Sequence, residues 1–258
     1  MKIWYQSGGS LGKHPRYNEY EATLKSYLSK IARPGTEVSV HGVELASPSI
    51  QTSKYEQLLH DYQIVENLLR AQREGYDAFC VGCAFDPGFY ALREVADIPV
   101  LSLSEACMLL ACLLSPNFSL LCHHKPLLLR VLALVKRYGL QSRFIECDSL
   151  RISPSELIRG FEDPEVILKP AREVAKDAAE KGVCMFVVAE GIINMIMAKH
   201  NIHEIEGIPV LEGGGALVKM TEMLVDLKNM GIDRSRLGMY TPLPKEDLDS
   251  LRKHYGLQ

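Results

Sequence analysis

Two side chains in this sequence could exchange protons with a substrate, because each follows a short apolar run. The run 78–82 leads into Cys83, and the run 185–189 leads into Glu190. A thiol and a carboxyl group both serve as general acids and bases in enzymes. We therefore consider Cys83 and Glu190 as candidate acid/base residues of an enzyme.

The residues that follow Cys83 predict the start of a helix. Asp86 suits the N-cap position, and Pro87 suits the first helical position. Backbone N–H groups and the positive dipole end at such a start favour a thiolate and can hold a substrate oxyanion. A carboxylate at Asp86 has the opposite effect on the thiol. A buried and inert thiol is the alternative interpretation of Cys83, since free cysteines are among the most buried residues.

The other cysteines and histidines give weaker signals. Cys80 and Cys83 form a C-x-x-C pattern, but Cys80 lies inside an apolar run instead of at a helix start, so a redox motif is not favoured. Cys122, His123 and His124 are adjacent. We expect the two histidines to line a cleft or cap a helix, and we expect no metal site.

Two glycine runs could bring the backbone close to a ligand. Residues 213–215 are all glycine and precede a predicted helix at 216–227, so their amides could bind an anionic group. Gly8 and Gly9 follow the first apolar run and give an equally weak signal. Neither run has the spacing of a nucleotide-binding loop, and we expect no organic cofactor.

Composition limits the class of protein. The chain has 258 residues, of which 47% are hydrophobic and 24% are charged, as expected for a soluble packed fold of one large or two ordinary domains. The net charge of -3 leaves no basic surface for nucleic acid. The N-terminus lacks the pattern of a signal peptide, and no apolar run could span a bilayer. We expect a cytoplasmic protein whose seven cysteines are reduced thiols.

The sequence contains an internal repeat, and its two copies hold the elements that position Cys83 and Glu190. Ile-Pro-Val-Leu follows Cys83 at 98–101 and follows Glu190 at 208–211. The apolar strand at 2–7 matches 118–124, and 36–45 matches 142–150. Helices are predicted at 54–73, before Gly75, and at 164–180, before Gly182. The first of these helices has an apolar face made of Leu58, Leu59, Tyr62, Val65, Leu68 and Leu69.

Strands that alternate with helices predict an α/β fold with parallel sheets. We expect two similar halves related by a pseudo-twofold axis, the first made of residues 1–101 plus 211–258 and the second of residues 102–210. Ligands of parallel sheets bind beyond the carboxyl ends of the strands. The strand ends Ser7, Cys83, His123 and Glu190 should therefore converge on a cleft between the halves. Duplication without a shared site is the alternative.

The chain resembles the aspartate/glutamate/hydantoin racemase superfamily, and within it the hydantoin racemases. The resemblance covers nearly the whole chain, and the cysteine followed by Asp-Pro-Gly is its most specific part. It rests on Tyr76-Asp77-Ala78, Gly82-Cys83-Ala84-Phe85-Asp86-Pro87-Gly88, Ala91-Leu92-Arg93-Glu94, Ile98-Pro99-Val100, Ile208-Pro209-Val210, Ala216-Leu217-Val218-Lys219 and Gly238-Met239-Tyr240-Thr241-Pro242-Leu243-Pro244.

The resemblance implies an isomerase without metal or organic cofactor, often a homo-oligomer, that acts on a small carbonyl or carboxylate substrate. It implies that a cysteine from each half faces one side of the substrate, with Cys83 as one acid/base. The implied substrate-binding positions are Ser7, Ser49, Ile50 and His123, and we add Ala84 and Gly191, which follow the two candidate acid/base residues.

The sequence departs from the family pattern at three places. Ala189-Glu190 replaces the second Gly-Cys, Ser7-Gly8-Gly9 replaces an Asn-Pro-Asn, and Cys122-His123 replaces paired threonines. An ordinary carboxylate is a weaker base than a thiolate by about 4 pKa units, which handicaps a two-base racemase unless burial raises the pKa of Glu190. Three functions follow: racemisation or epimerisation by Cys83 and Glu190, a one-base decarboxylase or isomerase that uses Cys83, or a non-catalytic binder of a small ligand.

Overall fold

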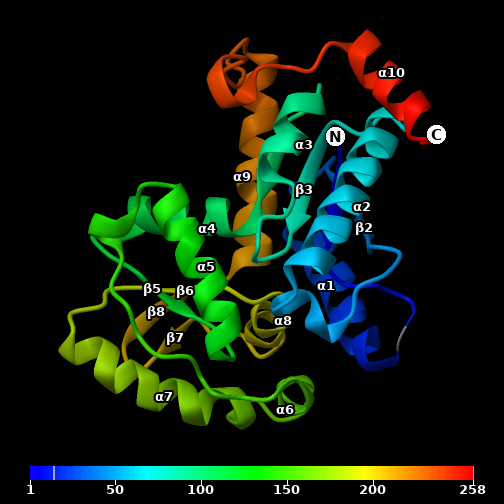
Figure 1. The fold of residues 1–258 in the computed structure, drawn as a ribbon. Helices are drawn as coiled ribbons and strands as arrows, with labels where there is room; N and C mark the ends of the chain where they lie inside the picture. Colours follow the sequence, from blue (N-terminus) through cyan, green and yellow to red (C-terminus); the bar gives the residue numbers. More distant parts are fainter. Residues whose placement is uncertain (14, 258) are drawn as a thin grey trace.

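The computed structural model describes residues 1–13 and 15–257, without the side chains of Arg16, Pro48 and Ser49. Its strands form two four-stranded sheets, each covered by helices. Figure 1 shows the sheets in two lobes, with α1 and α8 lying where the lobes meet. The α/β fold with two similar halves is confirmed.

The first sheet has the strand order β2-β1-β3-β4, and all its pairings are parallel. The strands are β1 (Lys2–Ser7), β2 (Glu37–His41), β3 (Ala78–Gly82) and β4 (Val100–Ser102). All five residues of β3 are buried. A strand that is covered on both faces must be apolar throughout, which explains the continuous apolar run before Cys83.

The second sheet has the strand order β5-β6-β8-β7, with β5 (Ser119–Leu121), β6 (Phe186–Val188), β7 (Glu204–Ile205) and β8 (Ile208–Leu211). It repeats the order of β1, β3 and β4 as β5, β6 and β8, and it has β7 as its fourth strand. The segment 142–150, predicted to match β2, contributes only a parallel bridge between Phe144 and Phe118 among the described residues. The prediction of a fully parallel sheet was wrong here, because β7 pairs with β8 in antiparallel fashion. Glu206 and Gly207, both with positive φ, form the two-residue hairpin turn that joins them.

Helices cover both faces of each sheet. They are α1 (Asn18–Ile31), α2 (Lys54–Arg73), α3 (Phe89–Val95), α4 (Leu103–Leu114), α5 (Lys125–Arg137), α6 (Pro154–Arg159), α7 (Glu165–Glu180), α8 (Gly191–Lys199), α9 (Gly213–Asn229) and α10 (Lys245–His254). Short 3-10 turns lie at Pro15–Tyr17, Pro48–Gln51 (η2), Gln141–Arg143 and Gly238–Tyr240. In the described part of the chain, no helix combines the length and apolarity that crossing a membrane requires.

Alternate residues of the first sheet face different helices. Trp4, Phe79 and Val81 pack in one cluster with residues of α2 and α3. Ile3 and Cys80 belong to a larger cluster that includes α1, α4 and α9 and continues into the second half. This shared core fixes the two sheets relative to each other, so the strand ends that face each other keep a defined separation.

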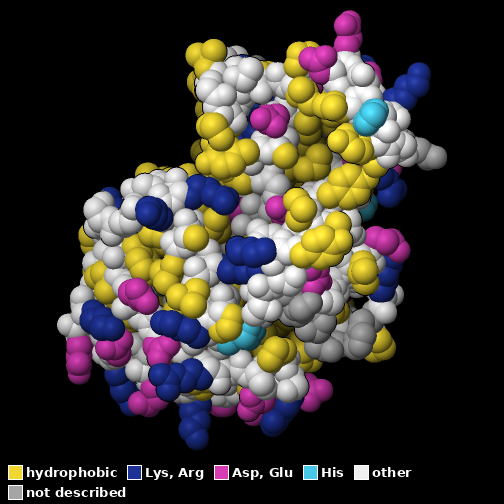
Figure 2. All heavy atoms as spheres, in the orientation of Figure 1, with side chains coloured by type: hydrophobic (Ala, Val, Ile, Leu, Met, Phe, Trp, Pro, Cys, Tyr) yellow, Lys and Arg dark blue, Asp and Glu magenta, His cyan; other side chains and the backbone are white. Residues whose placement is uncertain are grey.

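Helix α2 spans the predicted residues, but its predicted apolar face was wrong in the first half of the helix. Leu58, Leu59 and Tyr62 are exposed, whereas His60 and Ile64 are buried. On the buried side of α2, Nε2 of His60 lies 2.9 Å from the Gly8 backbone oxygen, so this side of the helix faces the carboxyl end of β1. Figure 2 shows hydrophobic side chains on the face of the molecule that carries α2.

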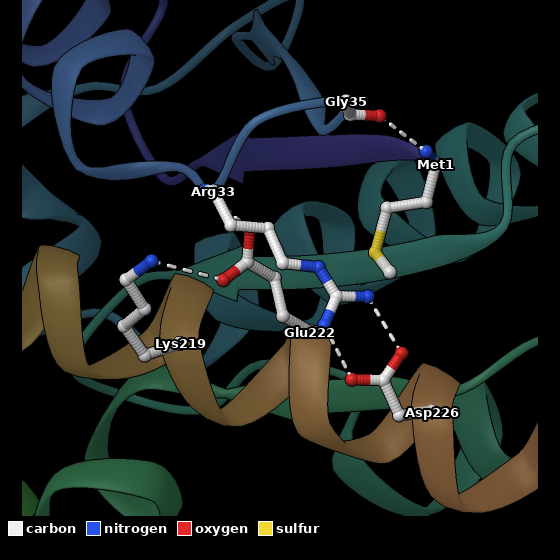
Figure 3. A network of polar contacts seen from close by, with 6 residues as sticks. All are labelled: Met1, Arg33, Gly35, Lys219, Glu222 and Asp226. Atoms are coloured by element: carbon white, nitrogen blue, oxygen red, sulfur yellow. Dashed lines mark hydrogen bonds and ion pairs between the residues drawn. The ribbon is translucent and has the colours of Figure 1, made fainter.

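Helix α9 is fastened to the first half by ion pairs at its outer side. The Arg33 guanidinium donates two hydrogen bonds to Asp226, at 2.5 and 2.6 Å, and the Arg33 backbone N–H donates to Glu222 (Figure 3). Residues 213–229 thus pack on the first half although they follow the last strand of the second. The boundaries at 101/102 and 210/211 remain a prediction.

Candidate active site

A cavity of about 130 Å³ lies at the carboxyl ends of β1, β3 and β6. Both halves contribute to its walls, as the repeat predicts. Its lining comprises Ser7, Gly8, Gly9, Tyr17, Tyr20, Ala46, Ser47, Ile50, Gln51, Gly82, Cys83, Ala84, Phe85, Leu127, Glu190, Gly191 and Ile192.

Six predicted site residues meet in this lining. They are Ser7, Ile50, Cys83, Ala84, Glu190 and Gly191. The side chain of Ser49 lies outside the described part of the chain, although its backbone belongs to η2 beside Ile50. His123 was expected to face the ligand, but it is fully buried and lies behind Glu190 instead of in the lining.

The Cys83 thiol is held in surroundings that favour its neutral form. Burial, and then the carboxyl groups of Asp86, Asp61 and Glu190, raise its pKa to about 12, against a hydrogen bond from the Phe85 backbone that lowers it. The predicted helix start at Asp86 was wrong, because α3 begins at Phe89 after the N-cap Gly88. A helix dipole therefore does not offset the effect of the carboxyl groups on the thiol, since its influence is confined to the first turn.

Asp86 caps a different helix from the one predicted. It adopts a positive φ of 46°, and its carboxylate accepts hydrogen bonds from the backbone N–H groups of Ser104 and Glu105, both at 2.9 Å. The Tyr138 hydroxyl donates a third, at 2.5 Å. Asp86 therefore binds the first turn of α4 and the end of α5 to the loop that carries Cys83. Burial raises its pKa to about 7 despite these hydrogen bonds.

Glu190 lies at the start of α8 and caps it. Its Oε1 accepts a hydrogen bond from the Ile192 backbone N–H at 3.3 Å. Nδ1 of His123 lies 2.5 Å from Oε2 of Glu190, in an orientation that is not aligned for a hydrogen bond. The His123 ring stacks on His124 with centroids 4.0 Å apart. His124 accepts from the Leu127 N–H and caps α5, as one alternative for this histidine pair predicted.

Tyr20 is a lining residue that the sequence did not indicate. Its hydroxyl lies 3.5 Å from Oγ of Ser7, and a Cβ added to Gly191 would lie 3.2 Å from it. Burial is the main cause of a raised pKa at Tyr20, so the hydroxyl stays protonated and can donate a hydrogen bond. No motif surrounds Tyr20. It lies on the buried face of an amphipathic helix, a position typical of a core residue, so the sequence gives no sign of a role at the site.

The two glycine runs differ in what they approach. Gly8 lies against the catalytic candidate, since a Cβ at this position would be 2.8 Å from Sγ of Cys83. The anion site expected at 213–215 was wrong, because the carboxylate of Glu212 accepts from the amides of Gly214 and Gly215 at 2.5 and 2.7 Å. The chain thus supplies its own anion at this helix start.

All seven cysteines are free thiols, as predicted. Cys80 points away from the cavity, because successive strand residues face opposite sides, and its thiol donates to Thr221 of α9. Cys80 and Cys83 therefore do not act as a pair. In the described ranges, no group of three or more His, Cys, Asp or Glu side chains could hold a metal ion.

This fold and this site define a class of protein that the comparisons with known proteins identify. The profile of the Asp/Glu/hydantoin racemase family matches residues 18–221, so the chain belongs to that family and is an isomerase. It is 29% identical to a hydantoin racemase from Pseudomonas sp. (strain NS671) over 225 residues, which cover 87% of each protein.

Two solved structures share the fold over most of their length. The allantoin racemase from Pseudomonas fluorescens has a TM-score of 0.78 and 21% identity, with 95% of this chain and 98% of that chain covered. The allantoin racemase from Klebsiella pneumoniae has a TM-score of 0.75 and 22% identity, with 95% and 94% covered. The resemblance inferred from the Cys-Ala-Phe-Asp-Pro-Gly segment is thereby confirmed.

Proposed function

We propose that this protein is a cofactor-independent racemase or epimerase that moves a proton on a carbon atom next to a carbonyl group. Cys83 and Glu190 are the proposed acid/base pair. One observation carries the proposal: both side chains line the same cavity, and each follows the equivalent strand of its half, β3 or β6.

The contacts of the two groups suggest where the proton rests before substrate binds. The raised pKa of Cys83 keeps its proton on sulfur, and the Glu190 carboxyl group accepts a hydrogen bond from the Ile192 N–H. Glu190 would then remove the substrate proton from one face. As negative charge develops on the carbonyl oxygen, the Cys83 thiol would deliver a proton to the other face. The opposite enantiomer requires a thiolate at Cys83 and a protonated Glu190.

The size of the cavity points to a compact substrate. Its volume of about 130 Å³ is small, since sites for drug-sized ligands measure roughly 300–1,000 Å³. The hydroxyl groups of Ser7 and Tyr20 supply polar contacts, while Ile50, Phe85 and Leu127 supply apolar ones. A hydantoin with a small substituent at C5, or an amino acid derivative of similar size, fits these properties.

A one-base reaction is the second candidate, and the contacts of Glu190 favour it. The Glu190 carboxyl group caps α8 and lies against His123, so protein contacts compete with a substrate for its oxygens. A neutral thiol at Cys83 could still protonate a carbanion that forms when a substrate loses carbon dioxide. Cys83 would then act alone, as a decarboxylase or isomerase of the same family requires.

Deuterium exchange separates these functions. The protein is incubated in D₂O with small hydantoins and amino acid derivatives, and label at the stereocentre, loss of optical rotation and release of carbon dioxide are measured. Racemisation predicts label and loss of rotation together. Cys83→Ser should slow the reaction by about 10²–10⁴-fold, whereas Cys184→Ser, at an exposed position, should not. Carbon dioxide release that depends on Cys83 supports the second candidate, and neither reaction across the panel supports a non-catalytic binder.

We also propose a cytoplasmic homo-oligomer, as the resemblance implies. The exposed apolar residues of α2, Tyr55, Leu58, Leu59 and Tyr62, are consistent with a surface that a second copy covers. Light scattering after size-exclusion chromatography tests this: a mass of one chain, 28.9 kDa, would contradict it.

A further inference from the structure

Arg130 of α5 contacts two walls of the cavity although its own side chain is outside the lining. Its Nη1 donates a hydrogen bond to the Ile50 backbone oxygen at 2.7 Å. Its Cζ lies 5.1 Å from the centroid of the Phe85 ring, within the range of a cation–π contact. Ile50 and Phe85 both line the cavity, and both belong to the first half. A single side chain of the second half thus holds η2 and the Cys83 loop together.

The charge of Arg130 is opposite to that of the carboxyl groups that face Cys83. Burial is the main influence on Arg130 and lowers its pKa, but the charges of Cys83 and Asp61 raise it. Electrostatic interaction is mutual, so the guanidinium must favour the thiolate form of Cys83 to the same degree. The titratable and charged groups around the thiol are Tyr20 of α1, His60 and Asp61 of α2, Asp86 of its own loop, Arg130 of α5 and Glu190 of α8.

One donor group of Arg130 has no acceptor in the part of the chain that the structure describes. Its Nη2 is buried and has no hydrogen-bond partner among the described residues. A buried donor of a charged group that stays unpaired costs stability, so such a group is retained at a position where its charge has a use. The guanidinium lies over Phe85, two residues after Cys83, so its positive charge is placed beside the loop where a thiolate must form during turnover.

We propose that Arg130 is a positioning residue of the racemase site: it holds η2 over the cavity through Ile50 and stabilises negative charge on the Cys83 sulfur. The inference rests on the proposed function only in giving Cys83 an acid/base role. Both parts concern the free protein and can be measured without substrate.

The variants Arg130→Lys and Arg130→Met separate the η2 contact from the stabilisation of charge on Cys83. Arg130→Lys keeps the charge but loses the planar group that bonds Ile50 while lying over Phe85. Arg130→Met keeps an apolar side chain of similar length and loses both. Lys136→Met removes the same charge from an exposed position of the same helix and is the matched control.

The test of the charge compares two alkylating reagents at Cys83. Iodoacetate is negative and iodoacetamide is neutral, so the ratio of their rates cancels access and thiolate fraction and reports the local potential. Peptide mass spectrometry distinguishes Cys83 from the other cysteines. We expect the iodoacetate/iodoacetamide ratio to fall several-fold in Arg130→Met and to stay near the wild-type ratio in Arg130→Lys and Lys136→Met. An unchanged ratio in Arg130→Met overturns the electrostatic part.

The test of the η2 contact is amide hydrogen exchange of residues 49–52, since Pro48 has no amide hydrogen. Both Arg130 variants should exchange these amides several-fold faster, and Lys136→Met should not. Equal protection in wild type and Arg130→Met overturns this part. If neither variant changes either readout, Arg130 has no role at the site. If both readouts respond and no racemisation is found with any substrate, the inference stands and the proposed reaction fails.

Discussion

Three carboxyl groups act electrostatically on the Cys83 thiol, which lines the cavity. Those of Asp86, Asp61 and Glu190 all raise its pKa, after burial itself. Burial and these neighbouring carboxyl groups together favour the neutral form of the thiol. The neutral thiol can therefore donate a proton to one face of a substrate, as the proposed reaction requires.

The Glu190→Gln variant tests the acid/base role proposed for Glu190. Glutamine retains an acceptor for the Ile192 N–H but cannot exchange protons, so racemisation should fall by about 10²–10⁴-fold. Removing the charge should also make Cys83 more acidic, so its rate of alkylation by iodoacetamide at pH 8 should rise. Glu180→Gln, at the exposed end of α7, serves as control. Wild-type racemisation in Glu190→Gln would assign the reaction to Cys83 alone.

Gly8→Ala tests the close approach of β1 to the thiol. The added Cβ would lie 2.8 Å from Sγ and 3.0 Å from Cβ of Cys83, so the thiol must move. A displacement of this size should reduce activity by about 10²-fold. Gly9→Ala is the matched control, because its Cβ would meet its nearest atom, Oγ of Ser7, at an ordinary 3.7 Å. Equal activities of the two variants, measured by deuterium exchange, would show that the thiol has room at this place.

At the scale of elements, the loop after β3 decides how the halves are joined. Asp86 lies three positions after Cys83 and caps α4, which packs on both α9 and α5. Tyr138, at the end of α5, donates to the same carboxylate. The residue that shapes the Cys83 loop is therefore also the residue that anchors two helices around the site.

Asp86→Asn should destabilise the protein by about 1–3 kcal/mol, because the amide group presents a donor where a second acceptor is needed. The free energy of unfolding in urea measures this, with Asp249→Asn at an exposed position of α10 as control. A loss equal to that of the control would mean that the hydrogen bonds to α4 contribute nothing.

The difference in the free energy of unfolding between wild type and Asp86→Asn should depend on pH. The pKa of Asp86 is raised to about 7 in the folded protein, so the folded state binds this proton more tightly than the unfolded chain does. The contribution of this group to stability therefore falls as pH rises from its ordinary pKa, about 4, toward 7. The stability advantage of wild type over Asp86→Asn should accordingly shrink between pH 5 and pH 8. An advantage that stays constant between pH 5 and pH 8 would show that Asp86 is ionised throughout and would contradict this prediction.

At the scale of the whole molecule, the separation of the halves limits the size of the substrate. The shared core fixes that separation, and the resulting cavity of about 130 Å³ leaves little room for a large substituent. We expect exchange at C5 of 5-methylhydantoin to be faster than that of 5-benzylhydantoin. Ile50→Ala should reduce this preference, by about 10-fold or more, because it enlarges the cavity at its wall. Rates of deuterium incorporation measure both, and a preference for the benzyl compound in wild type would mean that the halves open on binding.

The sequence by itself determined the duplicated α/β fold and the residues at its strand ends. Apolar runs of strand length, separated by helices, leave few alternatives for packing, so Cys83 and Glu190 could be located at equivalent positions without coordinates. The strands β1 and β8 and the helix α2 have the predicted bounds. The β7 hairpin was missed because a strand of two residues carries no pattern.

Only the tertiary structure decided what surrounds those strand ends. The positive φ of Asp86, the burial of His123 behind Glu190, and the capping of 213–215 by Glu212 all depend on neighbours that are distant in the chain or on a backbone turn that composition does not specify. The same holds for Tyr20 and Arg130, which come from helices without a motif. Periodicity predicts an apolar side, which the first half of α2 leaves exposed, whereas electrostatics and hydrogen bonding depend on distances across elements, which folding alone sets.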